Sequence, residues 1–129
     1  GKVFISIDND NKIHLPSIAL KLKNMNFELV ATKGTANFLL QNNIQVEIIN
    51  KVKEGDPHIV DEIKSNKIAL VINTTKTQGS IRDSYSIRRT SLMYNVPYYT
   101  TIAGARVAVD AIQHLKKHQL KVKSLQSKN

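Results

Sequence analysis

A chain of 129 residues, 41% of them hydrophobic, is the size of one globular domain with a core of its own. The formal net charge of +9 invites a nucleic-acid partner, but the chain has only three phenylalanines, four tyrosines and no tryptophan, and it shows no RNA-recognition or zinc-finger pattern. No apolar run approaches the roughly 18 residues of a membrane helix, and the lack of cysteine excludes disulfides and thiolate metal sites and favours a cytoplasmic location.

The first half of the chain predicts strands separated by helices. Residues 3–7 form a short apolar run, which is typical of a strand buried on both faces of a parallel sheet. Residues 28–31 and 46–49 are shorter strand candidates. Between the first two strands, one helix face is predicted from four apolar residues spaced three, four and three apart: Leu15, Ile18, Leu22 and Met25.

The second half continues the alternation. Asp56 followed by Pro57 predicts a helix start, with Ile59 and Ile63 on one face of that helix. The apolar run 68–72 predicts a fourth strand, and residues 96–100 predict a fifth. Ser80 is the expected N-cap of a helix that passes through three apolar or aromatic residues: Ile81, Tyr85 and Leu92. The last helix face is predicted from Ala105, Ala108, Ile112 and Leu115.

This order predicts a three-layer, Rossmann-like α/β domain. Its sheet is expected to be mostly parallel, with about five strands flanked by helices and joined by right-handed crossovers. Residues 1–129 are expected to form this single domain, with a basic C-terminal tail that is loose from about residue 116.

Polar residues lie at or just after the ends of four of the predicted strands, and the carboxyl ends of parallel strands meet at the edge where ligands bind. Hydroxyls, an amide, a glycine and lysines at that edge supply donors and positive charge, but no obvious catalytic acid, base or thiol. They predict a phosphate site rather than an active site. The residues are Ser6, Thr32, Lys33, Gly34, Thr35, Asn50, Lys51, Asn73, Thr74 and Thr75.

Each of these residues also has a plainer interpretation. Gly34 lets the backbone approach a ligand at a helix N-terminus, but the same segment is also an ordinary turn in which a threonine caps the helix. Lys12 and Lys51 suit phosphate as mobile charges, and the alternative is that both are ordinary surface lysines. No P-loop spacing is present, so ATP is not expected to bind this chain.

Other polar residues favour structural roles. His114 and His118 are four residues apart and share a helix face, but no third ligand accompanies them, so no metal site is expected. Arg88 and Arg89 are expected to stabilise the C-terminal end of their helix, away from the strand edge.

Six segments, in order, resemble the C-terminal allosteric domain of the bacterial carbamoyl-phosphate synthetase large subunit, a member of the methylglyoxal-synthase-like superfamily. They cover about residues 1–115. The segments are SIDNDNK (6–12), FELVATKGTA (27–36), NKVKEGDPHI (50–59), LVINTT (70–75), IRDSYSIRRTSL (81–92) and YNVPYYTT (94–101).

The resemblance implies a nucleotide-effector site and half of an ornithine site. UMP is implied as inhibitor and IMP as activator, held by the matching residues Ser6, Lys12, Thr32, Gly34, Thr35, Lys51, Asn73, Thr74 and Thr75. Tyr98 and Thr100 match the ornithine half-site, and Tyr98 and Tyr99 must point to opposite faces of the strand. The isolated domain is implied to be non-catalytic and to need no cofactor. The parent is implied to use ATP and a divalent metal and to work with its other domains and a small glutaminase subunit.

Two alternatives stay open. The first is an active methylglyoxal synthase, because Gly55-Asp56 resembles the segment with the catalytic aspartate of those enzymes. Against it, Arg82 and Tyr85 stand where that family has a histidine-aspartate pair and a further aspartate, which removes the imidazole acid. The second alternative is a basic nucleic-acid-binding module. Neither nucleic acid nor a membrane is the expected partner.

Overall fold

A computed structural model describes residues 1–49, 59–74 and 78–127 of the chain. Its elements alternate as the sequence predicts. In order they are β1 (Lys2–Ser6), the 3-10 helix η1 (Asn9–His14), α1 (Leu15–Asn24), β2 (Glu28–Ala31), α2 (Lys33–Gln41), β3 (Glu47–Ile48), α3 (Ile59–Lys64), β4 (Ile68–Asn73), α4 (Gln78–Met93), β5 (Tyr98–Tyr99) and α5 (Ile102–Ser127).

The five strands form one parallel sheet in the order β3-β2-β1-β4-β5. The chain moves outward from β1 through β2 to β3, then returns to the other side of β1 for β4 and β5. The direction of winding therefore reverses between β1 and β4, which is where ligands bind in open α/β sheets. The predicted fold class, a parallel five-stranded sheet flanked by helices, is confirmed.

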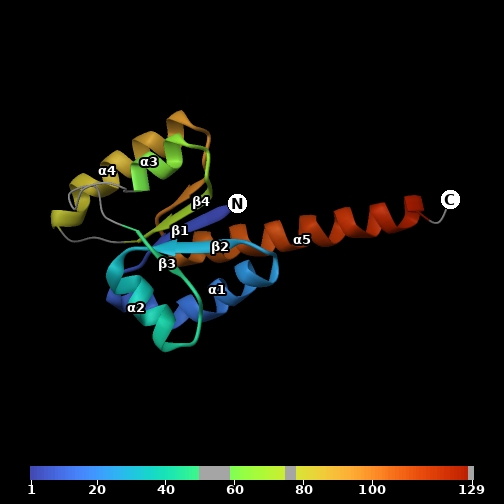
Figure 1. Cartoon of the computed structure of the whole chain (residues 1–129), viewed down its shortest axis with the longest axis horizontal. Coiled ribbons are helices and arrows are strands. Elements are labelled where there is room, and N and C mark those ends of the chain that lie inside the picture. Colours follow the sequence, from blue (N-terminus) through green and yellow to red (C-terminus); the bar gives the residue numbers. More distant parts are fainter. Residues whose placement is uncertain (50–58, 75–77, 128–129) are drawn as a thin grey trace.

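Helices cover both faces of the sheet (Figure 1). Val3 and Ile5 point to the face where α1, α2 and α5 pack, and Phe4 points to the face covered by α3 and α4. This alternation is the period of two that a strand imposes. The predicted face of α1 is confirmed, since all four of its apolar residues are buried. Burying each leucine or isoleucine contributes about 1.5–3 kcal/mol to the free energy of unfolding. The packing of helices on both faces therefore holds the strands, and the residues at their ends, in place.

The long final helix extends beyond the sheet (Figure 1). Its first part packs through Ala105 and Val109, but Leu115 is 58% exposed, so the prediction that Leu115 belongs to the buried face is wrong. The reason is length: at 1.5 Å per residue α5 spans about 39 Å, whereas six strand residues span about 20 Å. The helix continues through Ser127, and the looseness of the segment from about 116 stays a prediction.

Two smaller expectations about α4 are wrong. The helix already includes Gln78, so Ser80 is not its N-cap. Arg88 and Arg89 do not lie in its last turn, because the helix continues to Met93. The predicted start of α3 at Asp56 and Pro57 lies outside the described residues.

Asparagine ends four of the helices. Asn26, Asn43, Asn66 and Asn95 have φ values of 68°, 61°, 59° and 57°, each two residues after the end of α1, α2, α3 or α4. At α2, the N–H of Asn43 donates to the carbonyl of Leu40, and the N–H of Ile44 donates to the carbonyl of Leu39. The same paired bonds close the other three helices. This is a Schellman motif with asparagine in the left-handed position that glycine usually takes.

The left-handed cap gives a stability prediction with a control of opposite sign. Asn43→Ala is expected to destabilise the protein by about 1–2 kcal/mol, because a left-handed residue with a Cβ is strained and alanine lacks the polar side chain that eases it. Asn43→Gly should be neutral or stabilising. Asn37→Ala, in the interior of the same helix and also exposed, should stabilise by a few tenths of a kcal/mol. Urea denaturation of the three variants tests this, and destabilisation by both alanines would contradict it.

Candidate functional site

The predicted phosphate-binding residues gather at the carboxyl edge of the sheet. Ser6 ends β1 and is the register partner of Asn73, which ends β4, so the two flank the point where the winding reverses. Thr32 follows β2, Thr35 lies in the first turn of α2, and Thr74 follows β4. All five side chains are buried. We call Ser6, Thr32, Thr35, Asn73 and Thr74 the strand-end cluster.

Three members of the strand-end cluster continue one face of the sheet. Ser6, Thr32 and Asn73 each come two residues after an apolar residue of the core beneath α3 and α4: Phe4, Val30 and Val71. Because strand side chains alternate, the polar residues lie on the same face as those apolar ones. The hydroxyl of Thr32 lies 3.4 Å from that of Ser6, which joins the ends of β2 and β1. The core of this face thus ends in a polar row.

The two remaining threonines hold the loop after β1. The hydroxyl of Thr35 accepts the Ile7 N–H at 3.0 Å, and the hydroxyl of Thr74 accepts the Asp8 N–H at 3.1 Å. The Thr74 N–H also donates to the Ser6 carbonyl at 2.9 Å. The loop that leaves the central strand is therefore fixed by the start of α2 on one side and by the residue after β4 on the other.

This fixed loop leads to Lys12. The carboxylate of Asp8 accepts the Asn11 N–H at 3.1 Å and caps η1. One turn later, the Lys12 amine donates to the Asn9 side-chain oxygen at 2.8 Å. Lys12 is half-buried and lies on a short, capped helix that begins three residues after the end of β1.

The N-terminal end of α2 faces the same edge with its backbone donors. Thr32 is the N-cap residue with extended backbone (φ −66°, ψ 159°), but its side chain makes no capping hydrogen bond. The interpretation of Thr32 as a side-chain cap is therefore wrong. The N–H groups of the first three residues of α2 have no partner within the helix. Gly34, the second of them, is exposed, and a Cβ there would meet nothing within 4 Å.

The second predicted set, Tyr98 and Thr100, lies at the edge strand β5. Tyr98 packs on the α3 and α4 side and Tyr99 on the other side, which confirms that they point to opposite faces. Thr100 follows the strand and is exposed. Burial raises the pKa of the Tyr98 phenol above its ordinary value, although its hydrogen bonds to Asn73 and Ser84 and the charge of Arg88 oppose that shift. The phenol is thus protonated at neutral pH.

The structure connects the two predicted sets. The Asn73 side-chain amide donates to the Tyr98 hydroxyl at 3.0 Å and to the Ser84 hydroxyl at 2.9 Å. Lys51 and Thr75, also predicted for the nucleotide site, lie outside the described residues. Of the predicted nucleotide residues that are described, five form the strand-end cluster, and Gly34 and Lys12 flank it.

A family model described as an MGS-like domain matches residues 14–100, more than half of the chain. The chain belongs to the MGS-like domain family. The matched range contains every strand from β2 to β5 and most of the strand-end cluster.

Curated relatives of this MGS-like domain are carbamoyl phosphate synthase large chains, which confirms the resemblance. The large chain of Myxococcus xanthus is 50% identical over 126 residues, which cover 98% of this domain and 12% of the relative. That of Rhizobium meliloti is 48% identical over 128 residues, covering 98% and 11%. That of Methanocorpusculum labreanum is 42% identical over 125 residues, covering 97% and 12%. The domain therefore spans only about an eighth of the length of these relatives.

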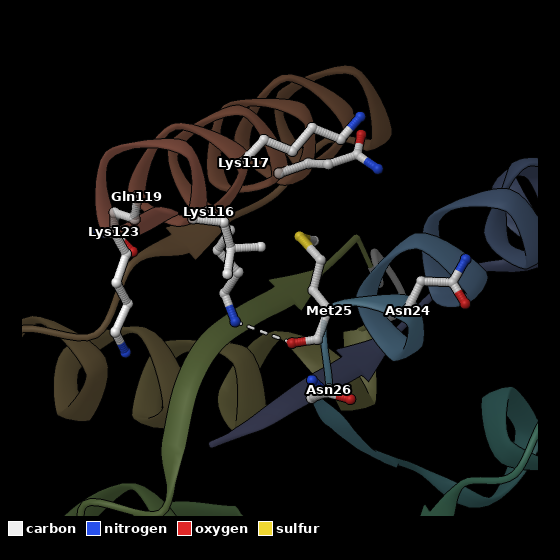
Figure 2. A pocket seen from close by; sticks show the side chains of 9 residues that line it. Asn24, Met25, Asn26, Lys116, Lys117, Gln119 and Lys123 are labelled. Carbon is white, nitrogen blue, oxygen red and sulfur yellow. Dashed lines mark hydrogen bonds between the residues drawn. The ribbon is translucent and has the colours of Figure 1, made fainter. Parts of the chain in front are cut away.

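A hollow of the MGS-like domain lies at the opposite edge of the sheet, between the end of α1 and α5 (Figure 2). Its lysines invite an anion, but Lys116 is already engaged. The Lys116 amine turns toward the Met25 carbonyl and donates to it at 2.9 Å, and it lies 4.5 Å from the centre of the Phe27 ring. These contacts hold α5 against the turn before β2. The Lys116 side chain in the hollow therefore serves the packing of α5.

Sequence reasoning missed Ser84 and misplaced Arg88 near the strand-end cluster. Ser84 reaches Asn73, and Arg88, one turn later on α4 and expected to lie away from the strand edge, is close enough to influence the Tyr98 phenol. The signal available was helical spacing, because Ser84, Ile87 and Ser91 form the side of α4 that faces inward, whereas Tyr85 and Leu92 are exposed. Within the described ranges, no cluster of three metal-binding side chains occurs and no helix is long and apolar enough to cross a membrane.

Proposed function

We propose that this MGS-like domain is the allosteric effector-binding part of a carbamoyl-phosphate synthetase large subunit, and that its strand-end cluster receives the phosphate of a nucleoside monophosphate. In this proposal UMP inhibits and IMP activates from overlapping positions. Tyr98 and Thr100 supply half of an ornithine site, and the rest of the large subunit supplies the other half. The parent joins bicarbonate and glutamine-derived ammonia, with ATP and a divalent metal, into carbamoyl phosphate for pyrimidine and arginine synthesis.

The observation that supports the proposal most is that the first backbone N–H groups of α2, which the Thr32 side chain does not cap, meet buried hydroxyls at the reversal point of the sheet. The N-terminal end of α2 offers N–H groups and a positive dipole end, which favour an anion. Ser6 and Thr32 add hydroxyls, and Lys12 adds charge. A phosphate uses all of these groups at once, because it accepts several hydrogen bonds and is negatively charged.

The described part of the site gives the enzyme alternative little support. A synthase of methylglyoxal needs a proton-transfer group beside the bound triose phosphate. Tyr85, at the position where that family has an aspartate, is 68% exposed on α4. No carboxylate or imidazole belongs to the strand-end cluster. Asp56 lies outside the described residues. We therefore propose binding without turnover for the isolated domain.

The nucleotide proposal predicts a large effect at Lys51. Lys51→Ala is expected to weaken UMP binding by about 1.5–3 kcal/mol, the contribution of a hydrogen bond to a charged group, which is roughly 10- to 150-fold in affinity. The domain should remain folded, because a charged lysine side chain is rarely part of a hydrophobic core. Calorimetric titration with UMP and IMP measures the effect.

The matched control is Lys121→Ala, which removes the same charge from the exposed outer part of α5. Its UMP affinity should equal that of the wild type. An unchanged affinity in folded Lys51→Ala would remove Lys51 from the site. The wild-type domain should not convert dihydroxyacetone phosphate to methylglyoxal. If it does, and Asp56→Asn abolishes the activity, the domain is a methylglyoxal synthase and the proposal of binding without turnover is wrong.

A further inference from the structure

The side chain of Asn73 is held from two other elements. Its amide nitrogen donates one hydrogen to the Ser84 hydroxyl of α4 at 2.9 Å and the other to the Tyr98 hydroxyl of β5 at 3.0 Å. The Ser84 hydroxyl is also close enough to the Tyr98 phenol to lower its pKa, which opposes the effect of burial. Asn73 is buried, with 4% of its surface exposed. The three residues form a polar triangle that joins β4, α4 and β5 on one face of the sheet.

Strand register explains why this triangle forms. Tyr98 pairs with Val71, and Asn73 lies two residues further along β4 on the same face. The tyrosine side chain therefore leans along its own strand to reach Asn73. A carboxamide is planar and turns as a unit, so using both of its N–H hydrogens fixes its orientation. Moving either partner must turn the amide or break a bond.

We propose that Tyr98 and Ser84 are positioning residues for Asn73. Through this triangle, a ligand bound at the strand-end cluster changes the affinity of the half-site at Tyr98, and a ligand bound at Tyr98 changes the affinity of the cluster for the nucleotide. The inference rests on the proposed function, because it assigns a regulatory link to that same site. The two predicted sets of residues then form one coupled unit. A ligand that draws the Tyr98 hydroxyl toward itself changes the orientation of Asn73. It therefore changes the affinity of the strand-end cluster for the nucleotide.

The link must act in both directions. If a ligand at Tyr98 alters nucleotide affinity through Asn73, a nucleotide that binds Asn73 alters the affinity at Tyr98 by the same factor. The triangle suits this role because Asn73 is buried, its two partners are half-buried, and the strand pairing of β4 with β5 leaves the backbone little freedom. The response is therefore confined to side-chain orientation.

A double-mutant cycle on UMP affinity tests the link in this chain. Tyr98→Phe removes only the hydroxyl and is expected to weaken UMP binding about fivefold, the typical effect of one lost hydrogen bond. Asn73→Ala should weaken it by more. Once Asn73 is alanine, Tyr98→Phe should have no further effect, because nothing is left to position. Ser84→Ala should reproduce Tyr98→Phe and gives a second route if Asn73→Ala does not fold.

The control is Tyr99→Phe, the same substitution one residue away on the opposite face, which should leave UMP affinity unchanged. The inference is overturned if Tyr98→Phe lowers UMP affinity equally in the wild type and in Asn73→Ala. It is also overturned if neither Tyr98→Phe nor Ser84→Ala lowers UMP affinity. In both cases the proposed nucleotide site stands. Failure of the wild type to bind UMP and IMP overturns the proposed function, and the inference falls with it. Urea unfolding of each variant separates loss of stability from loss of affinity.

Discussion

Thr35→Val is expected to lower the free energy of unfolding by about 1–3 kcal/mol, the cost of leaving one buried donor without a partner. The substitution keeps the shape of the side chain but removes the oxygen that accepts the Ile7 N–H at 3.0 Å. Thr35 is only 2% exposed, so water cannot easily replace that oxygen. The midpoint of urea denaturation should fall with little change in slope, because the amount of surface exposed on unfolding is the same.

Thr90→Val is the matched control. Thr90 is also a buried threonine, but its hydroxyl donates to the Ser86 carbonyl within α4 at 2.8 Å, so no backbone donor depends on it. Its loss should change stability by less than about 0.5 kcal/mol, as for substitutions away from critical contacts. If Thr35→Val is as mild as Thr90→Val, the first loop does not need the Thr35 hydroxyl.

This contrast separates two tasks within the strand-end cluster. Thr35 and Thr74 use their hydroxyl oxygens to fix the loop after β1, while Ser6 and Thr32 contact each other across the strand ends. The Thr35 hydroxyl also donates to the Ile7 carbonyl, but over 3.5 Å, a long hydrogen bond that a ligand oxygen can replace. Thr35 can therefore hold the loop and contribute to a ligand, so a stability loss in Thr35→Val is compatible with a binding role.

The three inner strands of the sheet, β1, β2 and β4, could be predicted from sequence because they are buried on both faces. Such strands appear as short continuous apolar runs, and residues 28–31 match β2 at both ends. The gathering of Ser6, Thr32 and Asn73 followed from the parallel topology alone, since all carboxyl ends share one edge. Each of these conclusions needed only local pattern and a general rule of topology.

Other features depend on contacts between distant residues. The bond from the Thr74 hydroxyl to the Asp8 N–H joins residues 66 positions apart, and nothing local to either residue indicates it. Leu92 looked like a core residue of α4, yet the inward side of the helix is set by its packing against the sheet and α3, and Leu92 is exposed. The left-handed asparagines are a different case. Their signal was present locally, but glycine is the usual residue at such caps and only five glycines occur in the chain.

Gly34→Ala should separate stability from binding most sharply, because the two are expected to change in opposite directions. Gly34 is the second residue of α2 and its φ lies outside the left-handed region, so alanine fits the backbone. A Cβ there meets nothing within 4 Å in the free protein. Alanine should therefore raise the free energy of unfolding, by up to about 1 kcal/mol, since it restricts the unfolded chain more than glycine does.

Binding of UMP should nevertheless weaken by at least about tenfold in Gly34→Ala, or 1.4 kcal/mol. A phosphate held by the first N–H groups of α2 lies against the backbone, and a methyl group at residue 34 occupies the space through which it approaches. Asn37→Ala, one turn later and also exposed, should share the gain in stability but keep wild-type affinity. Paired urea and calorimetric measurements on both variants decide the matter. A more stable Gly34→Ala that binds UMP as the wild type does would place the phosphate away from the start of α2, and the proposed site would then have to rest on the lysines and the hydroxyls alone.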